Sequence, residues 1–203
     1  MARLQTLLAG LLGLSVSTQT QTAVASPASP REVEAQHWPG RDKSHHHDCN
    51  GSPTPINERT AQEVIAQLNL APNVEKGYYV ETFRDAYNVT ADRSASTAIY
   101  YLLEGREGHS NWHRVDAVEV WHYYAGASLT LSLARDDGSP VREVTLGPDV
   151  FDGQQPQVAI AKWEWQRARS LGDWTLVGTT VAPGFDPSGF EMADPGWTPN
   201  TSR

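Results

Sequence analysis

The sequence contains very little cysteine, because Cys49 is the only one among its 203 residues. An intrachain disulfide is therefore excluded, and the fold must be stabilised by its hydrophobic core. Positive charge is also scarce: 16 Lys and Arg stand against 24 Asp and Glu, which gives a net charge of −8. We expect no nucleic-acid partner, since the phosphates of RNA or DNA would be repelled.

Signature motifs of common enzyme classes are missing as well. There is no Ser/His/Asp signature, no phosphate-cradling glycine loop and no dinucleotide fingerprint. The apolar run Leu4 to Val16 is too short to span a bilayer. It follows Arg3 and precedes Ala23-Val24-Ala25, which is the order of a secretory signal peptide.

We therefore predict a signal peptide over residues 1–25, a secreted or secretory-pathway protein, and no membrane attachment of the mature form. A targeting segment for another compartment and a mistaken start codon are the alternatives. Three Asn-x-Ser/Thr sequons, at Asn50, Asn88 and Asn200, are candidate glycosylation sites and agree with a secretory route.

The rest of the chain divides by composition. Residues 26–55 are rich in Pro, Ser and charged residues, and we predict a flexible linker there. Within it, His45-His46-His47 is interpreted as a solvated polar tract, with a surface metal site as the alternative, because metal ligands need a scaffold. The length and the 39% hydrophobic content support one domain, over residues 56–195, followed by a disordered C-terminal tail at 196–203.

The domain is predicted to begin with one short helix. Asn57 is a plausible N-cap, and apolar residues from Ala61 to Leu68 recur at helical spacing to form one face. Pro72 would end this helix. A helix of this size most simply packs on the outside of a barrel or sandwich.

Short strand-like segments follow in quick succession and favour an all-β domain. Alternating leucines, Leu129, Leu131 and Leu133, are typical of a strand with one buried face. The nine predicted strands are Gly77–Arg84, Thr97–Glu104, Ser110–Val115, Val118–Tyr124, Ser128–Arg135, Val141–Leu146, Gln157–Lys162, Trp163–Arg169 and Trp174–Val181.

The most informative stretch is Ser110 to Gly126, which places His113, Glu119 and His122 in two short strand-like segments. Side chains of these types can transfer protons or hold a metal in the lumen of a small barrel. His113, Glu119 and Gly126 occupy the first-histidine, glutamate and glycine positions of a cupin motif, whereas Val115 stands where the second histidine belongs.

Further segments carry the same resemblance. They include Gly77-Tyr78-Tyr79-x-Glu81-Thr82, Ser96 to Leu103, Glu119-Val120-Trp121-His122, Leu146-Gly147-Pro148-Asp149, Gly172 to Gly178 and Val181 to Phe185. Over residues 57 to 195 the chain resembles a cupin-superfamily group known mainly as a domain of unknown function. The resemblance implies a double-stranded β-helix (cupin jelly-roll) barrel, commonly a homodimer, and kinship with sugar-nucleotide epimerases and isomerases.

The chain departs from the family pattern near the expected pocket. The family reads Pro-His-Pro-Glu-Gly-Gly-Tyr-Tyr-Arg-Glu-Thr where this chain has Pro72 to Thr82, so a histidine and an arginine are replaced by Asn73 and Val80. Gln166 falls where metal-binding cupins carry their last histidine. His122 would point to the opposite face from Glu119 unless a bulge intervenes. We therefore predict no metal or other cofactor, with a site of His113, Glu119 and His122 as the weaker alternative.

Acid/base chemistry without a metal fits these residues better. His113 is the predicted acid/base and Glu119 its partner, while Tyr101, Trp112, Tyr123 and Gln166 are predicted to bind the substrate. Isomerisation, epimerisation, dehydration or cyclisation of a small organic molecule, such as a sugar derivative or a secondary metabolite, needs only such groups. A non-catalytic small-molecule-binding protein and a metal-dependent oxygenase or isomerase are the alternatives.

Overall fold

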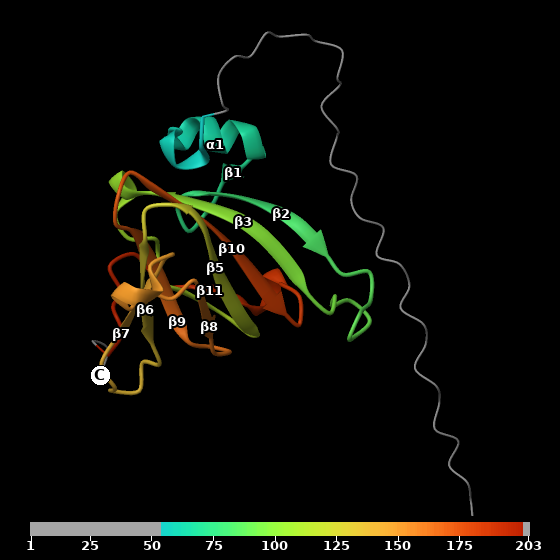
Figure 1. Cartoon of the computed structure of the whole chain (residues 1–203). Helices are drawn as coiled ribbons and strands as arrows, with labels where there is room; N and C mark the ends of the chain where they lie inside the picture. Colours follow the sequence, from blue (N-terminus) through green and yellow to red (C-terminus); the bar gives the residue numbers. More distant parts are fainter. Residues whose placement is uncertain (1–53, 201–203) are drawn as a thin grey trace, which may run out of the picture. The chain divides into compact units, whose positions relative to one another are not determined.

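The computed structural model describes residues 54–200 (Figure 1). The predicted signal peptide, nearly all of the predicted linker, Cys49, His45-His46-His47 and the Asn50 sequon lie outside these residues. Within the described part of the chain, no helix is long and apolar enough to cross a membrane.

One α-helix, α1 (Ala61–Leu68), opens the domain after a short 3₁₀ turn, η1 (Ile56–Glu58). The N-cap is Thr60, whose hydroxyl accepts a hydrogen bond from the amide of Glu63 while the Glu63 carboxylate accepts one from the amide of Thr60. This capping box satisfies two amides that have no partner inside the helix. The prediction of Asn57 as the N-cap is therefore wrong.

The actual role of Asn57 is to hold η1 against the sheet, since its Oδ1 accepts a hydrogen bond from the amide of Gly126 at 2.8 Å. The helix also ends earlier than predicted. Asn69 adopts a left-handed conformation with φ of 54° and terminates α1 three residues before Pro72.

The apolar face of α1 covers the outer side of a sheet. Ala61, Val64 and Ile65 are buried against Leu102 and Trp174. The helix thus lies outside the barrel, as predicted, and Figure 1 shows it across one end of the domain beside β1.

Within residues 54–200, eleven strands form two antiparallel sheets. The six-stranded sheet has the order β1 (Ala71–Pro72), β2 (Tyr78–Arg84), β3 (Thr97–Glu104), β10 (Trp174–Ala182), β5 (Val118–Gly126) and β8 (Gln157–Ile160). The five-stranded sheet has the order β11 (Phe190–Met192), β4 (His113–Val115), β9 (Trp165–Ser170), β6 (Leu129–Ala134) and β7 (Arg142–Leu146). This arrangement confirms the all-β jelly-roll prediction.

All nine predicted strands are present, and β1 and β11 are additional. The main core lies between the sheets and includes the alternating Leu129, Leu131 and Leu133, each at most 1% exposed. Three further 3₁₀ turns, η2 (Gly105–Glu107), η3 (Val150–Asp152) and η4 (Pro187–Gly189), lie in the connections.

The C-terminal segment is packed further than predicted. Trp197 lies 4.4 Å from Trp165 between ring centroids, and Asn200 bonds to the β6–β7 turn through the carboxylate of Asp136 and the amide of Gly138. The predicted tail from residue 196 is therefore corrected: the packed domain extends to Asn200. Aromatic burial and hydrogen bonding to the turn hold this segment, whose composition alone resembles a tail.

Candidate active site in the barrel lumen

A cavity of about 440 Å³ opens at one end of the barrel. Its walls come from β2, β3, β4, β5, β10 and β11, from the loop that precedes β2, and from the segment that follows β10. Thr97, Val181 and Glu119 lie at the strand ends that are remote from α1, and they place the cavity at that end. A cavity of this size can enclose a small organic molecule.

Strand register determines which side chains reach the cavity. Glu119 pairs with Val181 and Trp121 pairs with Thr179, and all four line it. Because successive residues of a strand point to opposite faces, His122 lies on the outer face. There its Nε2 is 3.2 Å from Oγ1 of Thr180.

His113 is almost completely buried, with 3% exposure, and is held from both sides of its ring. Its Nδ1 lies 3.1 Å from the carbonyl oxygen of Asn111, and its Nε2 lies 3.5 Å from Oε2 of Glu75. A carbonyl oxygen can only accept, so Nδ1 carries a proton. A hydrogen bond between Nε2 and the Glu75 carboxyl requires a proton on one of the two groups.

Glu75 is the direct partner of His113, whereas the sequence predicted Glu119 in this role. Burial raises the pKa of the Glu75 carboxyl, and the nearby charge of Glu119 raises it further, whereas His113 opposes both effects. A carboxyl group with a raised pKa keeps its proton to a higher pH than an ordinary glutamate.

The loop that carries Glu75 is fixed by backbone contacts. The amide of Asn111 donates to the carbonyl of Glu75 at 3.1 Å, and the hydroxyl of Tyr101 donates to the carbonyl of Lys76 at 3.1 Å. Lys76 in turn donates from Nζ to the carbonyl of His109 at 2.8 Å. Sequence reasoning missed Glu75, although it retains the glutamate of the family's Pro-His-Pro-Glu segment.

Glu119 is 7% exposed and is oriented by Gln166. The amide nitrogen of Gln166 donates to Oε2 of Glu119 at 2.5 Å, while the amide oxygen of Gln166 accepts from the indole of Trp121 at 3.0 Å. Gln166 is fully buried behind the cavity wall, so we place it as an orienting residue and not as a substrate contact.

The remaining predicted residues divide into two groups. Tyr101 lines the cavity, 5.9 Å from Trp121 in an edge-to-face arrangement, and burial raises the pKa of its hydroxyl. Trp112 and Tyr123 are outside the cavity lining. Trp112 packs against Trp197, and the hydroxyl of Tyr123 donates to the carbonyl of Gly126 at 2.5 Å.

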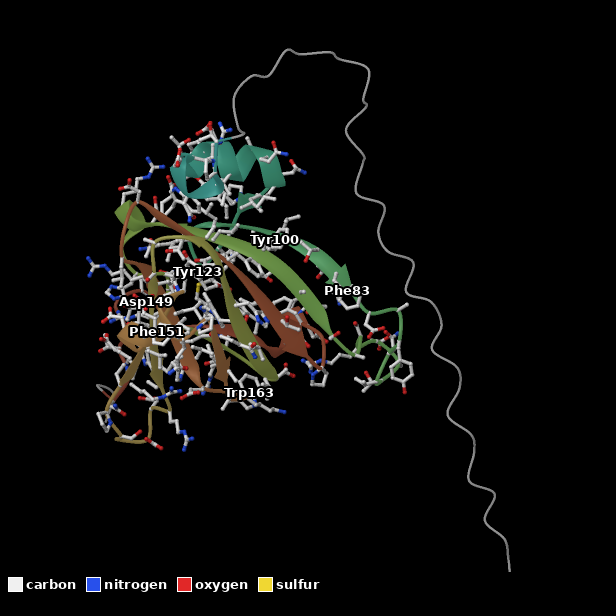
Figure 2. The ribbon with its side chains drawn as sticks, in the orientation of Figure 1. Phe83, Tyr100, Tyr123, Asp149, Phe151 and Trp163 are labelled. Atoms are coloured by element: carbon white, nitrogen blue, oxygen red, sulfur yellow. The ribbon has the colours of Figure 1, made fainter. Side chains whose placement is uncertain are left out.

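Two features of the strands explain these displacements. Trp112 is the immediate neighbour of His113, and adjacent residues of extended chain point in opposite directions. Tyr123 lies toward the α1 end of the domain, whereas Trp163 lies near the other end (Figure 2). Tyr123 and its contact with Gly126 are therefore remote from the strand ends that surround the cavity.

Metal binding does not fit the residues that are present. Within residues 54–200 no group of three His, Cys, Asp or Glu side chains is arranged to hold a metal ion. Glu119 is engaged by Gln166, His113 faces Glu75, and His122 points to the outer face. The weaker alternative of a site at His113, Glu119 and His122 is therefore not supported by the geometry, and we derive no step through a metal.

Two of the three sequons lie in the described part of the chain. Asn88 is exposed. The amide nitrogen of Asn200 is already engaged, because Nδ2 donates to the carbonyl of Ser139 at 2.8 Å. Of these two, Asn88 is the more accessible candidate for glycosylation.

Similarity to known proteins identifies the family of this chain. The sequence model of the family described as Cupin superfamily (DUF985) matches residues 62–193. A hypothetical protein from Leishmania major is 31% identical, with a TM-score of 0.61, over 66% of this chain and 86% of the other. A protein from Shewanella oneidensis is 32% identical, with a TM-score of 0.63, over 67% of this chain and 85% of the other. No curated protein matches the sequence.

Proposed function

Because the chain belongs to the cupin superfamily, in the family described as DUF985, we propose that its barrel lumen is the active site of an acid/base enzyme. The substrate is a small organic molecule, and the reaction moves a proton without a metal. Isomerisation, epimerisation, dehydration and cyclisation belong to this class.

The observation that supports this proposal is the contact between Glu75 and His113. Nε2 of His113 lies 3.5 Å from the Glu75 carboxyl group, beside a cavity large enough for a substrate. The Glu75 side chain keeps 18% of its surface exposed, so its carboxyl can reach a bound molecule. A pair that exchanges one proton is a general acid in one state and a general base in the other.

Each of the other residues has a supporting role. Glu119 presents a second carboxylate, which places negative charge beside the pair. Gln166 fixes the orientation of Glu119, and Tyr101 forms the wall and holds the loop of Glu75. In the reaction, a proton leaves the substrate for the Glu75–His113 pair. It returns to the other face of the same carbon in an epimerisation, to another atom in an isomerisation or cyclisation, or to the departing hydroxyl group in a dehydration, so that no proton is gained or lost overall.

The test is deuterium exchange in deuterium oxide, with a panel of small aldehydes, ketones and their hydroxy and amino derivatives, followed by nuclear magnetic resonance. We expect deuterium to enter at a carbon next to the carbonyl group of at least one compound. Glu75→Gln and His113→Ala should each slow the exchange by about 100-fold or more. His122→Ala is the matched control, because His122 lies on the outer face, and it should keep the full rate.

One outcome of this experiment would contradict the proposal. If both variants fold as the wild type does and exchange at its rate, the pair is not the acid/base. A compound that binds in the cavity and is recovered without deuterium would instead support the non-catalytic binding protein.

We also propose that the protein enters the secretory pathway and forms a homodimer. The signal-peptide pattern at residues 1–25 supports the first proposal, and the family resemblance supports the second. Mass spectrometry of the protein from the medium of expressing cells would show an N-terminus near Ser26 and a glycan at Asn88. Light scattering would give twice the mass of one chain.

A further inference from the structure

The charged residues around the cavity are predominantly acidic. Glu75, Glu81 and Glu119 line it, and Arg84 is the only Lys or Arg among the described residues that do so. Arg84 is already engaged: its Nη2 and Nε lie 2.7 Å and 2.9 Å from the two carboxylate oxygens of Glu81. A negatively charged substrate would therefore find no free Lys or Arg partner among the described lining residues.

Glu119 contributes a carboxylate to this space. Its Oε2 accepts a hydrogen bond from the side-chain amide of Gln166. The residue is 7% exposed, so its carboxylate is largely shielded from bulk water. A carboxylate that is largely removed from water is costly, and a ligand that carries a positive charge would relieve that cost.

The walls beside these carboxylates are aromatic. Tyr101 and Trp121 form one edge-to-face pair, and Phe185 and Phe190 form another at 6.0 Å between ring centroids. All four line the cavity. Aromatic faces bind the hydrocarbon part of a ligand and also attract a cation held over the ring.

From these three observations we infer that the cavity takes an organic cation, a protonated amine attached to an aromatic or aliphatic body. The ammonium group donates to the carboxylate of Glu119, and the body packs between the two aromatic pairs. This inference rests on the proposed function, since it names the substrate class of the same cavity. It also separates this chain from enzymes whose substrates carry phosphate groups, because those anions would meet the Glu119 carboxylate and no free Lys or Arg among the described lining residues.

The test compares three ligands of nearly the same shape and different charge by isothermal titration calorimetry on the full chain at neutral pH. Phenethylammonium is the cation, phenethyl alcohol is the neutral analogue and phenylacetate is the anion. We expect the cation to bind at least about tenfold more tightly than the alcohol, and phenylacetate to give no saturable binding. This comparison uses the wild-type protein, so it does not depend on the folding of a variant.

A pair of variants locates the effect. Glu119→Gln should weaken phenethylammonium binding by about tenfold and leave the alcohol nearly unchanged, because only the charge is removed. Glu143→Gln is the matched control, because Glu143 is an exposed residue of β7. It should leave all three affinities unaltered. Circular dichroism and thermal melting would establish that both variants fold.

Preferred binding of phenylacetate, equal binding of all three ligands, or no saturable binding of the cation would overturn the inference. The failure of the proposed function is a separate result. Cation binding without deuterium exchange would refute proton transfer and retain the substrate class, whereas exchange on neutral or anionic compounds alone would do the reverse.

Discussion

Asp116 faces the guanidinium of Arg93, and Glu75 faces the imidazole of His113. The surroundings of the two carboxyl groups shift their pKa values in opposite directions. Arg93 donates two hydrogen bonds of 2.6 Å to Asp116, and these bonds lower the pKa of that carboxyl. Glu75 lies 3.5 Å from His113, and burial raises its pKa. The first pair is arranged to stay ionised, and the second is arranged to retain a proton.

The two pairs also hold different parts of the structure. Arg93 donates from Nε to the carbonyl of Gly184, and the amide of Asp116 donates to the carbonyl of Gly189, both at 2.9 Å. These two hydrogen bonds fix the segment that carries Phe185 and Phe190, which form a wall of the cavity. An ion pair with short, two-point geometry gives shape to the site, while the looser and more buried contact between Glu75 and His113 is the pair that we propose for proton transfer.

The largest expected difference is in folding stability at neutral pH. Arg93→Ala leaves Asp116 without its two charged hydrogen bonds and should lower the free energy of unfolding by about 2 kcal/mol. Glu75→Gln removes a carboxyl whose ionisation opposes folding, so it should leave stability unchanged or raise it. Urea denaturation of both variants is the measurement, with the exposed Arg135→Ala as control. Equal losses in the two variants would contradict the distinction.

An intermediate effect is expected in the pH dependence. The folded pKa of Asp116 lies below its ordinary value of 3.8, so its contribution is present above that value and lost as the pH falls through the folded pKa. The folded pKa of Glu75 lies above its ordinary value of 4.5, so its contribution is complete below 4.5 and is lost as the pH rises through the folded pKa.

Two difference curves measure this behaviour. The stability of the wild type minus that of Asp116→Asn should increase as the pH rises toward 3.8 and stay level above it, and the same difference for Glu75→Gln should decrease as the pH rises above 4.5. Slopes of the same sign would refute the opposite shifts. His113→Ala serves as a further control, because it removes the group that opposes the raised pKa of Glu75.

The smallest expected effect is that of salt. Asp116 and Arg93 are about four-fifths buried, with side-chain exposures of 21% and 17%, so screening of their attraction is incomplete. Raising the salt concentration tenfold should reduce the stability difference between wild type and Arg93→Ala by only about 0.3 kcal/mol. Complete loss of that difference would show that the pair acts through long-range charge and not through its hydrogen bonds.

The strands were predictable because their signal is local. In Leu129, Leu131 and Leu133 the alternation itself marks the buried face, and nothing distant is needed to interpret it. The helix start was predictable too, since Thr60 and Glu63 form a capping-box pattern three residues apart. The choice of Asn57 followed residue preference and neglected that reciprocal pair.

The partner of His113 was not predictable in the same way. Glu75 precedes it by 38 positions in the sequence, and it reaches the imidazole because the Asn111 amide and the Lys76 side chain hold its loop. Nothing in the local pattern around Glu75 specifies those contacts. The fold class was therefore accessible from the sequence, as were the positions of His113 and Glu119, while the pairing of acid and base depended on loop packing.

The position of β10 has a consequence for the synthesis of the chain. β10 follows β1 to β9 in the sequence, but it pairs with β3 on one side and with β5 on the other. A nascent chain that has not yet reached Ala182 therefore exposes two strand edges that wait for the same partner. Such edges can pair with those of another nascent copy, so the risk of aggregation persists until β10 has been synthesised.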